Sequence, residues 1–339
     1  MNFRVRPAGN DDFASIYEMA KLTGGGFTNL PPDRGALVDK IIRSQKSFEA
    51  VRDEPADDMF LFVLENVETG QIRGTCQVFG MVGTDNAFYS YRLSTLTQTS
   101  QALGRTFKAE MLSLTTDLEG SSEVGGLFLH PGERAGGLGL LLARSRYLFI
   151  KRHRQRFGRR ILAELRGVID EAGGSPFWDA IAGRFFGMNF QEADEFNGTH
   201  GTQFIADLMP KTPIYTAMLP ETARAVMGVP HPSGRAAMRM LEREGFGFES
   251  YIDIFDGGPT MIAQTDQVRS IRDARDIVLA GVADEVEGQN MMLAAGELTS
   301  FAATCSNVHM EPEGGATITR SAAGMLGIQP GDSFTAIGR

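Results

Sequence analysis

The sequence predicts an α+β protein: a mixed sheet flanked by helices, followed by a small β-rich module at its C-terminal end. Three observations support this class. One strand-like segment and two amphipathic helices precede a series of apolar, strand-like runs. A further strand-like run then leads through a glycine-rich loop into a helix, at residues 124–142. After about residue 260, short strand-like runs separated by turns predominate.

The elements of the main sheet follow in order from the N-terminus. Phe3–Pro7 is expected to be a strand, and Asn10 or Asp11 to cap a helix that carries apolar residues at helical spacing. The Gly24–Gly26 segment is expected to be a loop. The remaining elements are a helix at about 34–47, a hairpin of strands 59–64 and 72–81, strands at 89–96 and 110–115, a helix at about 137–155 and a strand at 160–168.

Two later segments resemble each other and suggest an extended or partly duplicated fold. Residues 176–190 and 236–248 each read as a helix that ends at a glycine, Gly187 or Gly245, followed by an aromatic strand start. Two unrelated helices with glycine stops are the alternative. The rest of the chain predicts strands at 271–282 and 291–305, a helix at 321–326 and a strand at 334–337.

Composition limits the class of protein. The 339 residues, 42% hydrophobic and 22% charged, describe an ordinary globular chain of two or three domains. A net charge of -9 argues against nucleic acid or an anionic membrane as the main partner. Cys76 and Cys305 lack metal-ligand spacing and suggest a reducing compartment. No signal peptide or membrane span is visible, so we expect a cytoplasmic protein without a bound metal.

The glycine-rich loop Arg134-x-x-Gly137-x-Gly139 is the strongest chemical signal. Backbone N–H groups at a helix start bind anions, and glycines let a diphosphate approach the backbone closely. The dinucleotide fingerprint is excluded because Leu142 replaces its third glycine, and a Walker A loop is excluded because no Gly-Lys-Ser/Thr ending is present. The strand–loop–helix resembles the acyl-CoA pyrophosphate loop of GCN5-related N-acyltransferases. A glycine-rich turn that caps an ordinary core helix is the alternative.

Several longer strings make the resemblance more specific. They are Thr23–Pro31, Arg166–Glu171, Ser175–Trp178, Arg184–Phe186, Asp207–Lys211, Pro213–Tyr215 and Tyr251–Thr260. With these strings the chain resembles the arginine N-succinyltransferase family over nearly its whole length, most weakly after about residue 310. The resemblance implies a GCN5-related acyltransferase-like fold and transfer of succinyl from succinyl-CoA to the α-amino group of L-arginine, with ornithine as a possible substrate. It also suggests three parts: an acyltransferase-like domain at 1–190, a second half completing the active site at 191–260, and a β-rich module at 261–339.

The resemblance also places residues for the coenzyme and for proton transfer. Arg134, Gly137 and Gly139 would hold the CoA pyrophosphate, and Leu127 and Leu129 would pair with pantetheine, with Leu127 a specific succinyl-CoA contact. The family's proton-transfer histidine falls in a His-Pro context, which assigns that role to His231. Histidine titrates near neutral pH and can accept or donate the proton that acyl transfer requires. His130, beside the glycine-rich loop, is the rival; His153, His200 and His309 carry no comparable signal.

Acidic side chains should bind the guanidinium of the substrate, because arginine pairs with carboxylates. Glu164, Asp170 and Asp253 are the expected substrate-binding acids, with Glu171 and Asp256 as further candidates, and Arg166 is expected to bind the succinyl carboxylate. The basic run 151–160 would contact the 3′-phosphate of CoA or form a solvated helix end. We expect succinyl-CoA as co-substrate without a prosthetic group, direct transfer without a covalent relay, and possibly a homodimer. Preference for ornithine or another cationic amine, and a CoA-binding sensor without activity, are the alternatives.

Overall fold

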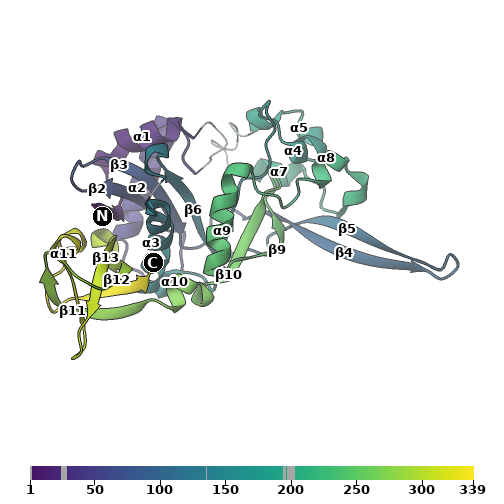
Figure 1. Ribbon diagram of the computed structural model, residues 1–339. Coiled ribbons are helices and arrows are strands. Elements are labelled where there is room, and N and C mark those ends of the chain that lie inside the picture. Colours follow the sequence, from purple (N-terminus) through teal and green to yellow (C-terminus); the bar gives the residue numbers. More distant parts are fainter. Residues whose placement is uncertain (1, 24–28, 135, 194–195, 197–202) are drawn as a thin grey trace. The chain divides into compact units, whose positions relative to one another are not determined.

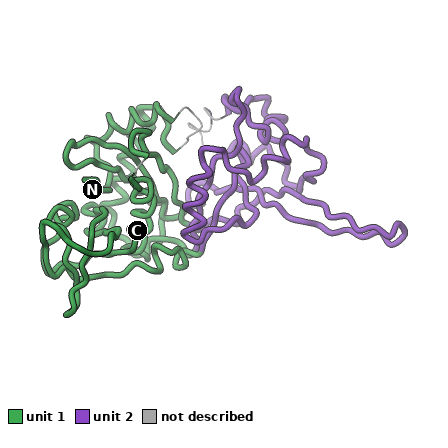
Figure 2. The backbone as a smooth tube through the Cα atoms, viewed as in Figure 1, with its two compact units in different colours: residues 1–81, 122–159, 264–339 green, residues 82–121, 160–263 purple. Residues whose placement is uncertain are grey.

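The computed structural model describes residues 2–23, 29–134, 136–193, 196 and 203–339, so the predicted Gly24–Gly26 loop and His200 lie outside the described residues. The chain divides into two compact units, each assembled from separate stretches (Figure 2). Unit 1 comprises Met1–Met81, Ser122–Arg159 and Gln264–Arg339, and unit 2 comprises Val82–Ser121 and Arg160–Ala263. The division into 1–190, 191–260 and 261–339 stays a prediction, because compactness alone does not delimit separately folding parts.

Unit 1 is built on a sheet with the strand order β12-β15-β11-β14-β13-β1-β2-β3-β6. Its pairings are antiparallel except for the parallel pair β11–β14. Because β12 also pairs with β13, the five strands β11 to β15 close into a ring. The strands are β1 (Phe3–Pro7), β2 (Met59–Asn66), β3 (Ile72–Phe79), β6 (Ser122–Leu129), β11 (Arg275–Ala283), β12 (Gln289–Ala295), β13 (Ala302–Met310), β14 (Ala316–Thr319) and β15 (Ser333–Gly338).

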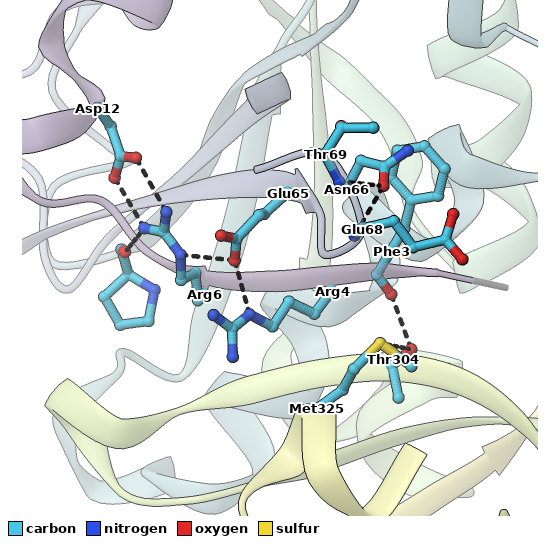
Figure 3. Close-up of polar contacts among 11 residues, drawn as sticks. Phe3, Arg4, Arg6, Asp12, Glu65, Asn66, Glu68, Thr69, Thr304 and Met325 are labelled. Carbon is cyan, nitrogen blue, oxygen red and sulfur yellow. Dashed lines mark hydrogen bonds and ion pairs between the residues drawn. The ribbon is translucent and has the colours of Figure 1, made fainter. Parts of the chain in front are cut away.

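Strand β1 connects this ring to the rest of the sheet. One edge of β1 pairs with β2, and the other pairs with β13 at Val5↔Ala303. The Thr304 hydroxyl on β13 donates a hydrogen bond of 2.8 Å to the Phe3 carbonyl oxygen (Figure 3). The earliest strand of the sequence is therefore an interior strand of the sheet, held on one side by a segment about 300 residues away.

Charged side chains of β1 form ion pairs with Glu65 of β2 and with Asp12. Arg4 and Arg6 both donate to one carboxylate oxygen of Glu65, at 2.6 and 2.9 Å. Arg6 also forms two bonds to Asp12, at 2.7 and 2.9 Å (Figure 3). Such a bidentate arginine–carboxylate pair fixes geometry as well as charge.

The helices of unit 1 pack on its sheet through apolar faces. Leu37 and Ile41 of α2 join Ile16 of α1 and Val63 of β2 in one buried cluster. On α3, the ring of Phe149 lies within 5.7 Å of four other phenylalanine rings, those of Phe48, Phe60, Phe62 and Phe301. The helical elements are η1 (Asn10–Asp12), α1 (Phe13–Lys21), α2 (Arg34–Glu49), η2 (Pro131–Glu133), α3 (Leu138–Arg152), η3 (Arg154–Arg156), η6 (Thr265–Gln267), α10 (Arg269–Arg272), η7 (Leu298–Ser300) and α11 (Arg320–Leu326).

Unit 2 carries a sheet in the order β7-β10-β9-β4-β5-β8 and several short helices (Figure 1). Trp178, Phe177 and Tyr91 are almost fully buried in its core. The strands are β4 (Ser90–Ser100), β5 (Arg105–Thr115), β7 (Arg160–Glu164), β8 (Ile214–Tyr215), β9 (Gly247–Ile252) and β10 (Pro259–Gln264). The helical elements are α4 (Pro176–Ala180), α5 (Gly183–Phe186), α7 (Gln203–Leu208), η4 (Thr216–Met218), α8 (Glu221–Arg224), η5 (Pro232–Gly234) and α9 (Arg235–Glu244).

The predicted class, an α+β protein with a mixed sheet and a β-rich C-terminal module, is confirmed. Gly187 and Gly245 both end helices in the left-handed conformation, as predicted. The aromatic strand follows only Gly245; after Gly187 the prediction is wrong, because residues 190–193 are helical.

Three further predictions of strands need correction. The predicted strand 291–305 is two strands, because Gly296, with a φ of 79°, turns the chain between β12 and β13. The predicted strand 271–282 begins later, at Arg275, because residues 269–272 form a helix. Strand β14 was not predicted. The predicted strand 160–168 ends at Glu164.

Candidate functional site

Strand β6 carries the predicted pantetheine contacts and contains a bulge. Its pairing with β3 shifts register between Thr75, which pairs with Phe128, and Gln77, which pairs with Gly125, so Gly126 and Leu127 form the bulge. Gly126 has a φ of 57°, and a Cβ there would lie 2.8 Å from Gln77, so this conformation requires glycine. Leu127 is the second residue of the bulge. A bulge beside a functional strand commonly redirects side chains or leaves backbone groups free for another partner.

The two predicted leucines, Leu127 and Leu129, are half-buried and absent from the buried core. Leu129 pairs with Gly74 of β3. Both positions therefore keep surface that a ligand could contact. The backbone carbonyl oxygens at this point are already engaged. That of Gly125 accepts from Arg146 at 3.2 Å, and that of Gly126 accepts from Thr75 at 3.2 Å.

The glycine-rich loop opens helix α3 as predicted. Gly137 is the N-cap of α3 with a φ of 81°, and Arg134 is exposed on the loop. No acidic residue lies in the first turn of this 15-residue helix, so its N-terminal dipole is not neutralised by its own side chains. A Cβ on Gly139 would meet only Leu129, at 3.7 Å, so the surrounding protein does not require glycine there. Close approach of a ligand to the backbone would require glycine at this position.

His130 is held by the loop itself. Its Nδ1 accepts from the Gly132 N–H at 3.2 Å and lies 2.9 Å from an Arg73 guanidinium nitrogen. Arg73 also donates to Glu133 at 3.1 Å. These contacts give His130 a local role in shaping the loop.

A second arginine, Arg339, contacts the glycine-rich loop. The Arg339 guanidinium donates to the Gly136 carbonyl oxygen, and a Cβ on Gly137 would overlap its terminal nitrogen. The buried Arg144 of α3 donates to the Gly338 carbonyl at 2.9 Å and so holds the chain next to Arg339. Arg339 was not found from the sequence, because it is about 200 residues from the loop and belongs to no motif.

In unit 2, His231 lies in the stiff Pro230-His231-Pro232 loop that leads into η5. Its backbone N–H donates to the Arg166 carbonyl at 2.7 Å, and its ring Nδ1 lies 2.7 Å from the Ser233 hydroxyl. Partial burial, and then the cation of Arg166, lower the pKa of His231. The ring is therefore neutral at pH 7 and available as a base.

The buried carboxyl group of Asp256 lies near Arg166, and the half-buried Asp253 lies beside Asp256. Asp253 Oδ1 accepts the N–H groups of Phe255 and Asp256, at 2.7 and 2.8 Å. Asp256 accepts the N–H groups of Gly167 and Gly258, at 2.7 and 2.8 Å. Burial raises the pKa of both groups, and for Asp256 the neighbouring charge of Asp253 adds to this effect. The structure thus brings His231, Arg166 and Asp253 together, with Asp256, which the sequence gave only as a further candidate.

The other expected substrate residues have different surroundings. Glu164 is half-buried at the end of β7, and Glu171 is exposed. Asp170 Oδ1 accepts the N–H groups of Ala172 and Gly174, at 2.9 and 2.8 Å, and so closes its own exposed loop.

The buried Nε of Arg166 has no hydrogen-bond partner within the described part of the chain. An unpaired donor of this kind is suited to an anionic ligand.

The basic run 151–160 is largely engaged within unit 1. Arg156 is buried and pairs with Asp58 at 2.7 Å, and Arg154 forms two bonds to Asp266, at 2.6 and 2.9 Å. Arg152 donates to the Gly296 carbonyl at 3.0 Å. The expected solvated helix end is therefore wrong for Arg156, which is buried, and contact of the run with the 3′-phosphate of CoA stays a prediction.

Comparison with known proteins identifies the family. The model of the arginine N-succinyltransferase beta subunit matches residues 3–270, and that of its C-terminal domain matches residues 275–338. The chain belongs to the arginine N-succinyltransferase family. It is 42% identical over 305 residues to the arginine N-succinyltransferase of Citrobacter koseri, covering 90% of this chain and 86% of that protein. The corresponding Salmonella arizonae protein is 43% identical over 277 residues, covering 81% and 80%.

A solved structure agrees with this assignment. The arginine/ornithine succinyltransferase subunit AI of Pseudomonas aeruginosa superposes with a TM-score of 0.90 at 32% identity, covering 99% of this chain and 98% of that one. Within the described residues of this family member, no helix has the length and apolar character to span a membrane. Across the same residues, no cluster of three or more potential metal ligands is found.

Proposed function

We propose that this protein transfers the succinyl group of succinyl-CoA to the α-amino group of L-arginine, giving N2-succinyl-L-arginine and CoA. Membership of the arginine N-succinyltransferase family carries the proposal. The glycine loop of unit 1 and the histidine loop of unit 2 supply the two functions that the reaction needs: binding of an anionic coenzyme and transfer of a proton.

Unit 1 binds the coenzyme in this proposal. The N–H groups at the start of α3 and the exposed Arg134 hold the diphosphate, and Gly137 and Gly139 let it approach the backbone. Leu127 and Leu129 contact the pantetheine arm from the half-buried end of β6. No prosthetic group takes part.

His231 acts on the proton of the substrate amine. The α-ammonium group of arginine loses one proton to solvent before its nitrogen attacks the thioester carbonyl. As the new C–N bond forms, the nitrogen loses a second proton; the C–S bond breaks, and the sulfur leaves as a thiolate that takes up a proton. Neutral His231 accepts the second proton from the nitrogen and, once protonated, supplies it to the thiolate.

The remaining candidates recognise the two charged ends of the substrates. Arg166, whose buried Nε lacks a partner in the described chain, binds the succinyl carboxylate. Glu164, Asp170 and Asp253 are proposed to bind the guanidinium. One carboxyl oxygen of each aspartate already accepts two backbone N–H groups, so the guanidinium would be bound by the other oxygen of Asp170 and of Asp253.

We also propose a cytoplasmic location and a homodimer. The matching family is named for a beta subunit and the Pseudomonas aeruginosa protein is titled a subunit, which supports an assembly of more than one chain. Sedimentation equilibrium of the purified chain tests this part; a monomer at micromolar concentration contradicts it.

A thiol-release assay with succinyl-CoA and a panel of amines tests the reaction. Release that depends on L-arginine supports the proposal. Preferential release with L-ornithine supports the alternative that the name of the P. aeruginosa protein suggests. Binding of succinyl-CoA without release for any amine would indicate a CoA-binding sensor.

Replacement of His231 tests the proton-transfer step. His231→Ala is expected to lower kcat by about 10²- to 10⁴-fold, the usual contribution of a general acid–base group. The dissociation constant of succinyl-CoA, measured calorimetrically, should stay within about twofold, because the coenzyme residues belong to unit 1. His309→Ala, at an exposed position of β13, is the matched control and should behave as the wild type. An unchanged kcat in His231→Ala removes this residue from the mechanism.

A further inference from the structure

A tight turn at residues 253–258 lies beside the loop that carries His231. The Asp253 N–H donates to the Gly258 carbonyl at 2.8 Å, and the Gly257 N–H donates to the Asp253 carbonyl at 3.1 Å. A Cβ on Gly258 would lie 2.0 Å from the Leu165 carbonyl oxygen, so glycine is required for this close packing. The turn is therefore a rigid, buried structure.

The Asp256 carboxylate projects from this turn with both oxygens engaged. One accepts the N–H of Gly258 at 2.8 Å, and the other accepts the N–H of Gly167 at 2.7 Å. Both hydrogen bonds are buried, and only 7% of Asp256 is exposed. With both oxygens used and little exposed surface, Asp256 is poorly suited to bind a substrate directly. Its carboxylate acts inside the protein.

A single peptide group links Asp256 to the histidine. The N–H of the Arg166–Gly167 peptide donates to Asp256, and the C=O of the same peptide accepts the backbone N–H of His231 at 2.7 Å. Hydrogen bonds at the two ends of one peptide polarise it and strengthen each other in a buried setting. A second tether, from the Gly228 N–H to the Gly257 carbonyl at 2.9 Å, joins the same turn to the start of the His231 loop.

The His231 loop depends on such tethers. Pro230 and Pro232 flank the histidine, and proline has no N–H to donate. The His231 N–H is therefore the one backbone donor in this three-residue stretch, and Arg166 accepts it. A shift of this hydrogen bond would move the imidazole, and small displacements of a catalytic group reduce rates steeply.

We propose that Asp256 is a positioning residue that fixes the place of the His231 imidazole through the Arg166–Gly167 peptide. This inference rests on the proposed role of His231. Asp256 touches neither substrate; its effect on the reaction passes entirely through His231.

Two substitutions of Asp256 test the link. Asp256→Ala removes both acceptors and is expected to lower kcat by about 10- to 100-fold, the usual cost of losing a group that orients a functional residue. Asp256→Asn keeps one acceptor, so its kcat should lie between those of Asp256→Ala and the wild type. KM for succinyl-CoA should stay within about twofold in both. Asp58→Asn, at an equally buried carboxylate of unit 1 that pairs with Arg156, controls for loss of a buried carboxylate and should change stability without changing kcat.

A double-mutant cycle separates positioning from general structural support. If Asp256 acts only through His231, Asp256→Ala should cause no further loss of kcat in the His231→Ala background. Equal fold-losses in both backgrounds overturn the inference, as does a wild-type kcat in Asp256→Ala. If His231→Ala itself keeps full activity, the proposed proton-transfer step fails instead, which distinguishes the two failures.

A measurement on the wild type needs no variant to fold. Amide hydrogen exchange should be slow at His231 and Gly167, because both N–H groups are held in the described hydrogen bonds. Exchange of the His231 amide at the rate of an unstructured chain would show that the tether does not persist and would overturn the inference.

Discussion

At the scale of single residues, Ser233 fixes the orientation of the His231 ring. His231 Nδ1 lies 2.7 Å from the Ser233 hydroxyl and accepts the Ser233 N–H at 3.3 Å. Nδ1 is therefore an acceptor, and its lone pair is directed at Ser233. The two contacts hold the plane of the ring.

Ser233→Ala is expected to lower kcat roughly tenfold, in the range typical of residues that orient a catalytic histidine. The reason is that the ring loses one of the two contacts that fix its orientation. Steady-state kinetics with both substrates checks this, with Ser321→Ala, at an exposed serine of α11, as control. A kcat equal to that of the wild type would show that the hydroxyl does not orient the ring.

The sequence indicated those candidate site residues that belong to contiguous motifs. Arg134, Gly137 and Gly139 are recognisable as candidates because a loop that binds an anion and begins a helix within six residues needs a basic side chain and glycines close together. Asp256 and Arg339 act through contacts with segments 89 and 203 residues away, and no local pattern encodes such contacts. Their roles became visible only in the folded chain.

At the scale of elements, the end of α3 contains a histidine buried without charge. His153, the C-cap of α3, packs its ring 4.7 Å from that of Phe149, and its Nε2 accepts the Leu298 N–H at 3.3 Å. Burial lowers the pKa of His153 to about 4, although the charge of Glu297 opposes the shift. Protonation of this histidine therefore disfavours the folded state.

This burial predicts a loss of stability in acid. In the unfolded chain His153 takes up a proton near pH 6.5, whereas in the folded chain it does so only near pH 4. The unfolded state thus binds more protons between these values, and the free energy of unfolding should fall as the pH falls from about 6.5 to about 4. Urea unfolding at several pH values checks this. His153→Gln should show a flatter pH dependence in this window, whereas His309→Gln should not; equal slopes would refute the assignment.

Secondary structure was predictable where the pattern is local and periodic. β1, α2 and the β2–β3 hairpin agree with expectation, because the N-cap Asp33 and a turn with Gly70 at a φ of 69° mark their limits. α1 forms as expected, but the prediction that Asn10 or Asp11 caps it is wrong, because both lie in η1. β4 extends to Ser100 and β5 begins at Arg105, so both strands are longer than expected. Many of their outer residues are polar and exposed, so apolar periodicity could not reveal them.

At the scale of the whole molecule, neither compact unit corresponds to one continuous stretch of sequence. The closed ring of β11–β15 belongs to the same unit as β1, α2 and α3. Its ties to that unit include the β1–β13 pairing and the bonds of Arg152 to Gly296 and to Thr335. The closure of the ring could not be derived from the sequence, because pairing of β12 with β13 and β15 depends on long-range register.

Removal of the ring is therefore expected to damage unit 1. A chain that ends at residue 274 leaves the β13-facing edge of β1 unpaired and removes Phe301 from the rings of Phe62 and Phe149, so it should aggregate and lose cooperative unfolding. Size-exclusion chromatography and thermal unfolding check this. Thr304→Val, which removes the bonds of this hydroxyl to the Phe3 carbonyl and the Met325 sulfur, should cost about 1 kcal/mol and keep the association state of the wild type. A truncated chain with the association state and the melting temperature of the wild type would contradict the expectation.

The interior place of β1 also affects how the chain is made. The ribosome synthesises residues 3–7 early, yet the partner segment 302–310 emerges about 300 residues later, roughly 15 to 60 s at ordinary translation rates. During that interval the nascent protein exposes a strand edge that neighbouring chains on the same messenger could pair with. A chaperone that shields this edge until translation ends would raise the yield of native protein, and slower elongation would lower it.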